Sequence, residues 1–151
     1  MKDLQSQLRE LEGYISNLEE MNVTISKVSV GWHIDHSLRV VNGVIKALEK
    51  SDSEKFEGGF NFFGSIFLTF NFLPRGRGRA PKLVQPEGEI SAESLKHRLD
   101  FAYSNYNIIG QLDENNYFKH PMFGDLKRDK AVKFIRIHTD HHLKIIREIL
   151  A

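Results

Sequence analysis

Two histidines near the C-terminus have the spacing of a metal-binding pair. In the segment IRIHTDHHLKII, residues 135–146, His138 and His142 stand where an amphipathic helix would normally turn leucine toward its core. On a helix, residues i and i+4 lie one turn apart on the same face. Two imidazole nitrogens can then converge on one ion, as helical zinc motifs do. Two ligands do not make a secure site, so a third must come from another helix.

The candidates for the third ligand lie about a hundred residues earlier, in the segment SVGWHIDHS. On a helical wheel, His33 falls within the broad apolar arc of its helix, and His36 falls at the edge of that arc. The small residues Gly43 and Ala47, aligned with His36, would allow another helix to approach closely. Either histidine could reach the interior, and periodicity alone does not choose between them.

A hydrogen-bonded network of core histidines is the alternative to a metal site. Burying an imidazole without a partner costs roughly a few kcal/mol, so the pair needs either an ion or polar neighbours. The spacing is consistent with both interpretations. His141 and His97 point away from the apolar stripes of their helices and are expected at the surface. His120, in the loop before the last helix, could cover the site or brace the loop.

The elements that must position these histidines are helices. Apolar residues recur at alternating steps of four and three, which marks one face of an amphipathic helix. The segments with this pattern are 4–18, 30–50, 56–70, 91–109 and 135–149. Ser29 and Ser91 are the expected N-caps of the second and fourth helices, and Pro74 stops the Phe-rich third helix, which we expect to be buried. The pattern predicts one all-α domain over residues 1–151, an antiparallel four-helix bundle with an extra short helix.

Composition limits the classes of function. The charge is nearly balanced, with 21 Lys+Arg against 20 Asp+Glu, so neither nucleic acid nor a membrane is the expected partner. The absence of cysteine excludes disulfides, thiolate nucleophiles and cysteine-based zinc sites, and it suits a cytoplasmic protein. The start MKDLQSQLRELEGY shows no apolar signal core, and the most apolar segment, 60–73, is too short and too rich in Asn and Gly to span a bilayer.

A basic loop, RGRGRAPKLVQPEGE at 75–89, follows the third helix. Arg75, Arg77 and Arg79 could guide an anionic substrate or a low-molecular-weight thiol to the mouth of the bundle. Glycine and proline already explain this segment as a solvated connection, and this plainer interpretation is favoured.

The histidine segments together resemble the DinB-like superfamily of metal-binding helical bundles. The resemblance rests on SVGWHIDHS followed a hundred residues later by HTDHH. The stretch HPMFGDL…F…HTDHHL (120–143) is similar to an uncharacterised branch in which an HPxFG loop precedes a helix with H-x-x-H-H. In this family the second-helix ligand lies seven residues after the Ser or Asn that opens the helix, which matches Ser29 to His36. The resemblance spans nearly the whole chain in helix order.

Carried over residue by residue, the resemblance implies a metal triad of His36, His138 and His142. The branch usually has Trp in the first turn of the last helix, where this chain has Ala131, and a Thr or Ser cap where this chain has Lys127. These departures concern packing and capping rather than the ligands. They weaken the assignment to the branch more than the expectation of metal binding.

A three-histidine site would be open for chemistry. Three neutral imidazoles can hold a divalent ion (Zn, Ni, Mn or Fe) and leave positions for water or substrate. Characterised relatives include thiol-dependent transferases, so the resemblance implies a metal-dependent transferase or hydrolase with a small-molecule substrate. No general base identifies itself, and we expect His33, His120 and Tyr106 as neighbours of the ligands.

A non-catalytic role is the alternative function. The same bundle, metal-bearing or metal-free, could serve as a binding or oligomerisation module. Exposed apolar faces of the helices would suit a homodimer, the commonest closed assembly. Metal content separates the two hypotheses in part, and a metal-dependent turnover would decide between them.

Overall fold

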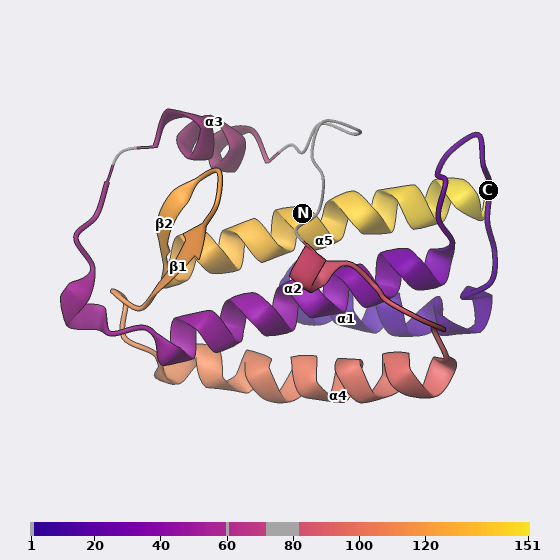
Figure 1. Cartoon of the computed structure of the whole chain (residues 1–151), viewed down its shortest axis with the longest axis horizontal. Helices are drawn as coiled ribbons and strands as arrows, with labels where there is room; N and C mark the ends of the chain where they lie inside the picture. The colour runs from indigo at the N-terminus through magenta and orange to yellow at the C-terminus, as the bar shows by residue number, and fades with distance from the viewer. Residues whose placement is uncertain (1, 60, 72–81) are drawn as a thin grey trace.

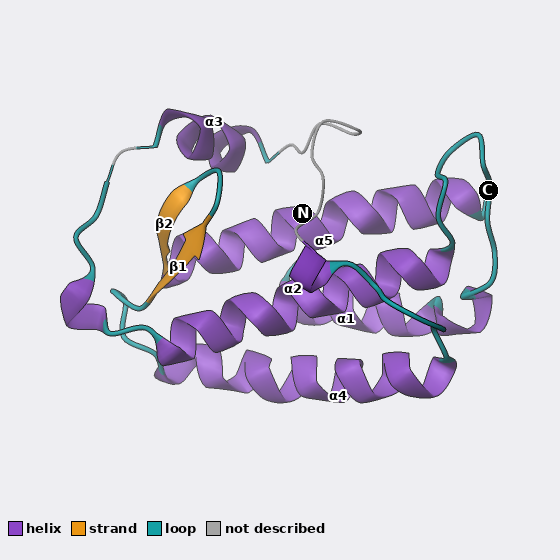
Figure 2. Cartoon of the chain, viewed as in Figure 1, coloured by secondary structure: helices purple, strands orange, loops and turns teal. Residues whose placement is uncertain are grey.

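The computed structural model describes residues 2–59, 61–71 and 82–151 of the chain. Within these residues the protein is mostly helical, with five α-helices and one two-stranded antiparallel sheet (Figures 1 and 2). The elements are α1 (Leu4–Gly13), α2 (Val30–Lys50), α3 (Phe62–Phe70), α4 (Ala92–Ile108), β1 (Tyr117–His120), β2 (Gly124–Lys127) and α5 (Arg128–Ile149). In this described part of the chain, no helix is long and apolar enough to cross a membrane.

Four of the helices pack around a shared apolar core. Helix α2 contacts α4 and α5, and α1 contacts the same two helices. Figure 1 shows these four helices side by side, with α3 outside them next to the hairpin. The large side chains that are fully buried are Leu4, Leu8, Leu11, Ile34, Leu38, Ile45, Leu48, Leu95, Ile135, Ile137, Leu143 and Ile146. Removing such apolar surface from water, worth roughly 25 cal/mol per Å², is the main term that holds the helices together.

The second and fourth helices begin where their predicted caps stand. Ser29 Oγ accepts a hydrogen bond from the backbone N–H of Trp32 (3.3 Å) at the start of α2. At the start of α4, the side chains of Ser91 and Ser94 each accept from the other's backbone N–H. Both caps satisfy donors that have no partner inside the helix. The prediction of α2 over residues 30–50 is confirmed, and this start fixes which of its residues face inward.

The segment 113–127 contains a β-hairpin, so the all-α prediction was wrong in this part. Strands β1 and β2 pair antiparallel, with Phe118 opposite Leu126. Leu126 is buried and Phe118 is half-buried against the core. Each strand has only four residues, which is too short for an alternation of period two to stand out in the sequence.

The hairpin turn is held by a side chain rather than by a two-residue turn signal. The Nδ1 atom of His120 accepts hydrogen bonds from the backbone N–H groups of Met122 and Phe123, both at 3.1 Å. Gly124 has a φ of +70°, a backbone conformation that glycine adopts without steric cost. The HPMFG motif is therefore explained by the turn that it builds.

The Phe-rich helix begins later than predicted. Helix α3 starts at Phe62 instead of Phe56, because Gly58, with a φ of +73°, breaks the pattern before it. Asn61 caps the new start, since its Oδ1 accepts from the backbone N–H of Gly64 (2.7 Å). The first predicted helix is also shorter, because α1 ends at Gly13 and a separate 3-10 turn covers 15–17.

Helix α3 is also more exposed than the prediction of a buried helix allowed. Phe67 and Leu68 are buried. On the outer face Phe62, Ile66 and Phe70 are 61%, 42% and 73% exposed. The helix lies outside the four core helices, and these three side chains keep much of their surface exposed to solvent.

Candidate metal centre

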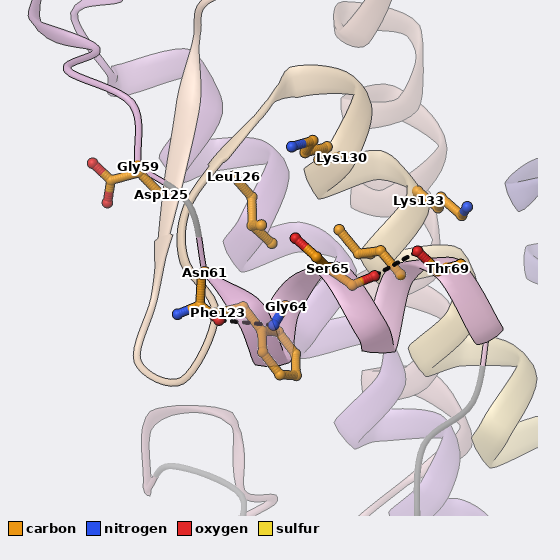
Figure 3. A pocket seen from close by; sticks show the side chains of 11 residues that line it. Gly59, Asn61, Gly64, Ser65, Thr69, Phe123, Asp125, Leu126, Lys130 and Lys133 are labelled. Carbon is orange, nitrogen blue, oxygen red and sulfur yellow. Dashed lines mark hydrogen bonds between the residues drawn. The ribbon is translucent and has the colours of Figure 1, made fainter.

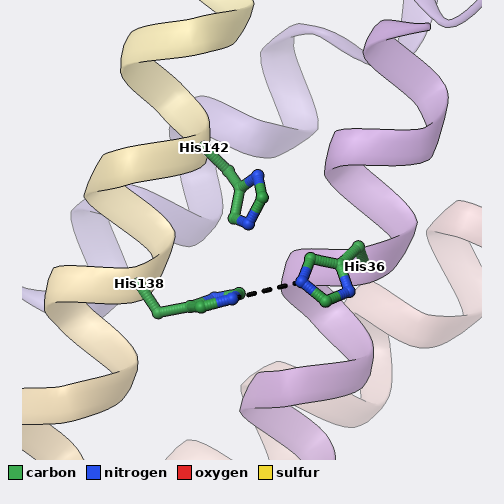
Figure 4. Close-up of side chains that lie close together, drawn as sticks. All are labelled: His36, His138 and His142. Atoms are coloured by element: carbon green, nitrogen blue, oxygen red, sulfur yellow. Dashed lines mark hydrogen bonds between the residues drawn. The ribbon is translucent and has the colours of Figure 1, made fainter. Parts of the chain in front are cut away.

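His36, His138 and His142 lie together between α2 and α5. Each offers one ring nitrogen, and these three nitrogens are within 4.8 Å of one another, so the cluster could hold a metal ion. Figure 4 shows His138 and His142 reaching from successive turns of α5 toward His36 on α2. The two helices run antiparallel, because His33 contacts His142 and the later His36 contacts the earlier His138. This packing joins residues about a hundred positions apart.

The backbone and one aromatic ring hold His36 in a single orientation. Its Nδ1 lies 2.8 Å from the carbonyl oxygen of Val84. Because a carbonyl only accepts, Nδ1 carries the proton and Nε2 keeps its lone pair. The indole of Trp32 stacks on the His36 ring, with centroids 4.9 Å apart and planes 21° apart. The Nε2 atom then faces α5, 3.2 Å from Nε2 of His138.

His138 has a ring nitrogen without a partner. Its Nδ1 is buried, and no hydrogen-bond partner for it exists among the described residues. A buried polar group in this condition costs about 1–3 kcal/mol, and such exceptions in folded proteins call for an explanation. Metal coordination by the other nitrogen, Nε2, would place the proton on Nδ1 and would not itself give that atom a partner. The fit to a divalent transition metal rests on the donor set, which is three imidazoles.

His33 lies behind His142 and does not belong to the three-nitrogen cluster. Its Nδ1 lies 2.9 Å from Nδ1 of His142, and its Nε2 lies 2.9 Å from Oγ of Ser26. The side chain is buried. Of the two histidines that periodicity left open on the second helix, His36 is thus the one that joins the cluster, and His33 touches a cluster member from outside.

Burial keeps the cluster histidines neutral. Burial lowers the pKa of His36, and it lowers the pKa of His138 and His142 well below the usual 6.5. For the two α5 histidines, repulsion between neighbouring imidazoles adds to this lowering. For His36, the hydrogen bond to Val84 and the nearby Asp35 carboxylate oppose it. Neutral rings with free lone pairs are the form that binds metal.

The carboxylate next to His36 in sequence is engaged elsewhere. Asp35 pairs with Arg39 on α2 (2.7 Å) and with Arg98 on α4. Its side chain is only 4% exposed. The two arginines are partly exposed, at 22% and 36%, while the carboxylate between them is buried. Asp35 therefore ties α2 to α4, and its contacts assign it no part in the cluster.

His120 lies outside the three-nitrogen cluster and is linked to it through an aromatic neighbour. Its ring stacks on Phe123, with centroids 4.2 Å apart, and contacts the edge of Phe134 at 4.8 Å. Phe134 in turn contacts His138, with centroids 5.9 Å apart. Burial lowers the pKa of His120 to about 4, which suits its role as an uncharged acceptor in the hairpin turn.

The remaining expected site residues lie away from the cluster or outside the described chain. Tyr106 is half-buried on α4 and packs against the core, and no described ring contact joins it to the cluster histidines. His141 is half-buried rather than exposed, with its ring edge-on to His142 at 5.1 Å. The arginines of the basic loop fall outside the described residues: Arg75, Arg77 and Arg79.

A cavity of about 270 Å³ lies apart from the histidine cluster, between α3, the hairpin and the first turns of α5 (Figure 3). Its described lining does not include His36, His138 or His142. The polar and charged side chains around it are Asn61, Ser65, Thr69, Asp125, Lys130 and Lys133. This cavity and the histidine cluster therefore lie in different parts of the described molecule.

Sequence reasoning missed three residues that orient the cluster. Trp32 stands four residues before His36, and this i, i+4 relation was a signal that the two rings share a helix face. Val84 acts through its backbone carbonyl, and Ser26 lies in an irregular segment before α2. Neither leaves a pattern in the sequence.

Comparison with known proteins adds no identification. No family model, curated protein or solved structure matches the chain. The resemblance to the DinB-like superfamily therefore stands on the quoted motifs alone.

Proposed function

We propose that this protein binds one divalent transition-metal ion through His36, His138 and His142. The observation that carries the proposal is the convergence of three ring nitrogens, within 4.8 Å, from two separate helices. The lowered pKa values of the three histidines support it, because neutral imidazoles are the form that binds metal. Imidazole ligands accept zinc, nickel, manganese and iron, so the donor set does not select among them.

We further propose that the chain is a DinB-like four-helix bundle enzyme, a transferase that uses a small thiol or a hydrolase. A metal held by three imidazoles would supply open coordination positions for water or a substrate group. The chain's own part is to orient His36 through Val84 and Trp32 and to keep the cluster rings neutral by burial. The mostly helical fold and the histidine motifs support this proposal.

A metal-free polar network is the second candidate, because the histidines also pair with one another. His36 faces His138 at 3.2 Å, and His33 faces His142 at 2.9 Å. Without an ion, each pair would be one hydrogen bond between α2 and α5. Such buried bonds can specify how helices pack, and they would suit a non-catalytic binding or oligomerisation module.

Elemental analysis of protein purified without chelators tests the metal proposal. We expect close to one divalent ion per chain in the parent and in His97→Ala, which changes an exposed histidine on α4. We expect none in His138→Ala. A parent that stays metal-free after dialysis against Zn²⁺, Ni²⁺, Mn²⁺ and Fe²⁺ would leave only the polar network.

Turnover needs a separate test, because metal binding alone does not make an enzyme. A screen of thiol-transfer and hydrolysis substrates should find an activity that chelation abolishes and added metal restores. Activity that survives chelation would contradict a metal-dependent reaction.

A further inference from the structure

Three side chains, Ser26, His33 and His142, form a hydrogen-bonded series that starts in the segment before α2. Ser26 Oγ lies 2.9 Å from Nε2 of His33, and Nδ1 of His33 lies 2.9 Å from Nδ1 of His142. The two histidines are only 4% and 8% exposed, so water barely competes for these contacts. The hydroxyl of Ser26 is itself fixed, since its Oγ accepts from the backbone N–H of Val28 at 3.2 Å.

The positions of the protons in this hydrogen-bonded series decide whether His142 can bind a metal. A neutral imidazole carries one proton, on either Nδ1 or Nε2. If His142 donates from Nδ1 to His33, then His33 donates from Nε2 to Ser26, and Nε2 of His142 keeps its lone pair. In the reverse direction, His33 donates from Nδ1 and Nδ1 of His142 accepts. The proton of His142 is then on Nε2. Neither nitrogen could then be a ligand.

The orientation of the His142 ring favours the first direction for a metal site. Since Nδ1 faces His33, the other ring nitrogen is the one available to the cluster. Figure 4 shows a nitrogen of His142 on the side of the ring that faces His36 and His138. His36 is arranged in the same way, with Nδ1–H donated to Val84 and Nε2 turned to the cluster.

We infer that Ser26 and His33 are positioning residues that hold His142 as its Nδ1–H tautomer, with Nε2 presented to the metal. This inference rests on the proposed metal function. Hydrogen-bond partners of ligating histidines fix the ring and the tautomer, and their loss typically weakens metal binding about 10- to 100-fold. The Nδ1 atoms of His36 and His142 would then each have a hydrogen-bond partner, Val84 and His33 respectively. Nδ1 of His138 has no such partner among the described residues.

Zinc affinities of matched variants test the positioning role. Ser26→Ala removes the terminal acceptor, and His33→Phe removes the Nδ1 acceptor while filling the same space. We expect each to weaken Zn²⁺ binding about 10- to 100-fold in competition with a chelating dye. His33→Asn puts an amide oxygen near the position of Nδ1 and should restore most of the affinity. His97→Ala should bind as the parent does.

Imidazole ¹⁵N chemical shifts of the metal-free protein report the tautomer directly. We expect a protonated Nδ1 on His142 in the parent, and a shift toward the Nε2–H tautomer in Ser26→Ala and His33→Phe. An Nε2–H tautomer in the parent would overturn the inference. So would Zn²⁺ affinities of both variants equal to that of the parent.

The two measurements separate failure of the inference from failure of the proposed function. A parent that binds no metal refutes the proposed function, while the ¹⁵N shifts still report on the tautomer. A parent that binds Zn²⁺, with unchanged affinity in both variants, refutes only the positioning role. Ser26 is a half-buried residue outside the helices, so Ser26→Ala keeps the test open if His33→Phe does not fold.

Discussion

The histidine cluster and the cavity beside α3 are two candidate binding regions that differ in the elements from which they are built. The cluster brings three ring nitrogens within 4.8 Å of one another on two core helices. The cavity offers about 270 Å³ but takes its lining from a peripheral helix, a hairpin and the start of α5. A metal needs convergent donors held rigidly, whereas an organic ligand needs space. In this molecule the donors lie on two core helices, and the cavity lies between a peripheral helix, the hairpin and the start of α5.

A line of aromatic rings joins the two regions. Phe67 stacks on Phe123, with centroids 4.6 Å apart, and Phe123 contacts Phe134 at 6.1 Å. Phe134 contacts His138 at 5.9 Å. Changes in one region could pass to the other through packing along this line or along α5, which carries both Lys133 of the cavity lining and His138 of the cluster. The comparison therefore predicts that most substitutions affect one region and spare the other.

The largest expected effect is stabilisation by metal. A ligand at a hundred times its dissociation constant stabilises the native state by about 2.7 kcal/mol. We expect Zn²⁺ to raise the free energy of unfolding by this amount in the parent and in Lys133→Ala, which changes the cavity lining. In His138→Ala the effect of Zn²⁺ should disappear. Denaturant unfolding with and without Zn²⁺ measures this increase in the free energy of unfolding. Loss of the increase in Lys133→Ala would show that the two regions are not independent.

Acid should destabilise both regions. For His120 the pKa shift corresponds to about 3 kcal/mol, and solvent screening of this half-buried ring reduces the expected effect to about 2 kcal/mol. Burial lowers the pKa of His120 to about 4, below the value near 6.5 in the unfolded chain. The unfolded state therefore binds more protons, so this stability is complete above pH 6.5 and is lost as the pH falls toward 4. His120→Asn keeps an acceptor for the turn without titrating there.

The pH profile of unfolding checks this assignment. The free energy of unfolding should fall less steeply between pH 6.5 and 4 in His120→Asn than in the parent. Equal slopes would show that His120 is not the group responsible. Because burial also lowers the pKa of the cluster histidines, protons should displace bound metal only at a pH below the usual histidine range.

A smaller effect is expected from the cap of α3. Asn61→Ala removes the acceptor for the Gly64 N–H and the donor to the Met122 carbonyl (3.1 Å). Loss of such a cap costs about 1 kcal/mol, and we expect faster hydrogen exchange of the α3 amides. Zn²⁺ affinity should not change. Asn61→Asp keeps the cap and should lie between Asn61→Ala and the parent, and a weakened Zn²⁺ affinity in Asn61→Ala would show that the two regions are coupled.

The smallest effect is expected on the outer face of α3. Phe70 is 73% exposed, and substitutions at exposed sites usually change the free energy of unfolding by about ±0.5 kcal/mol or less. Phe70→Ala should stay within that range in a urea titration. A loss of several kcal/mol would mean that this face is covered by a partner in solution.

The parts of the fold that the sequence predicted are those fixed by local rules. Ser29 and Ser91 were identified as caps because their position before an apolar periodicity is typical of helix starts. The i, i+4 spacing of His138 and His142 placed both rings on one face of α5. These features depend on neighbours within a turn or two of the chain.

The parts that were missed depend on contacts between distant segments. Phe56 continued an apolar periodicity, but Gly58 and Asn61 moved the start of α3, and its outer face stayed exposed. The choice between His33 and His36 needed the packing of α5 against α2. The role of Val84 could not be predicted from its side chain, because only its carbonyl oxygen contacts His36.

The stacking of Trp32 on His36 gives the protein a built-in optical probe. Trp32 is the one tryptophan in the chain, and its indole lies flat against an imidazole of the cluster at 4.9 Å. All tryptophan fluorescence therefore originates at this site. Bound ions with an open d shell, such as Ni²⁺ or Cu²⁺, should quench the fluorescence of Trp32. Zn²⁺, whose d shell is filled, should change the fluorescence intensity without this quenching. Occupancy can thus be followed in the unlabelled, unmodified chain.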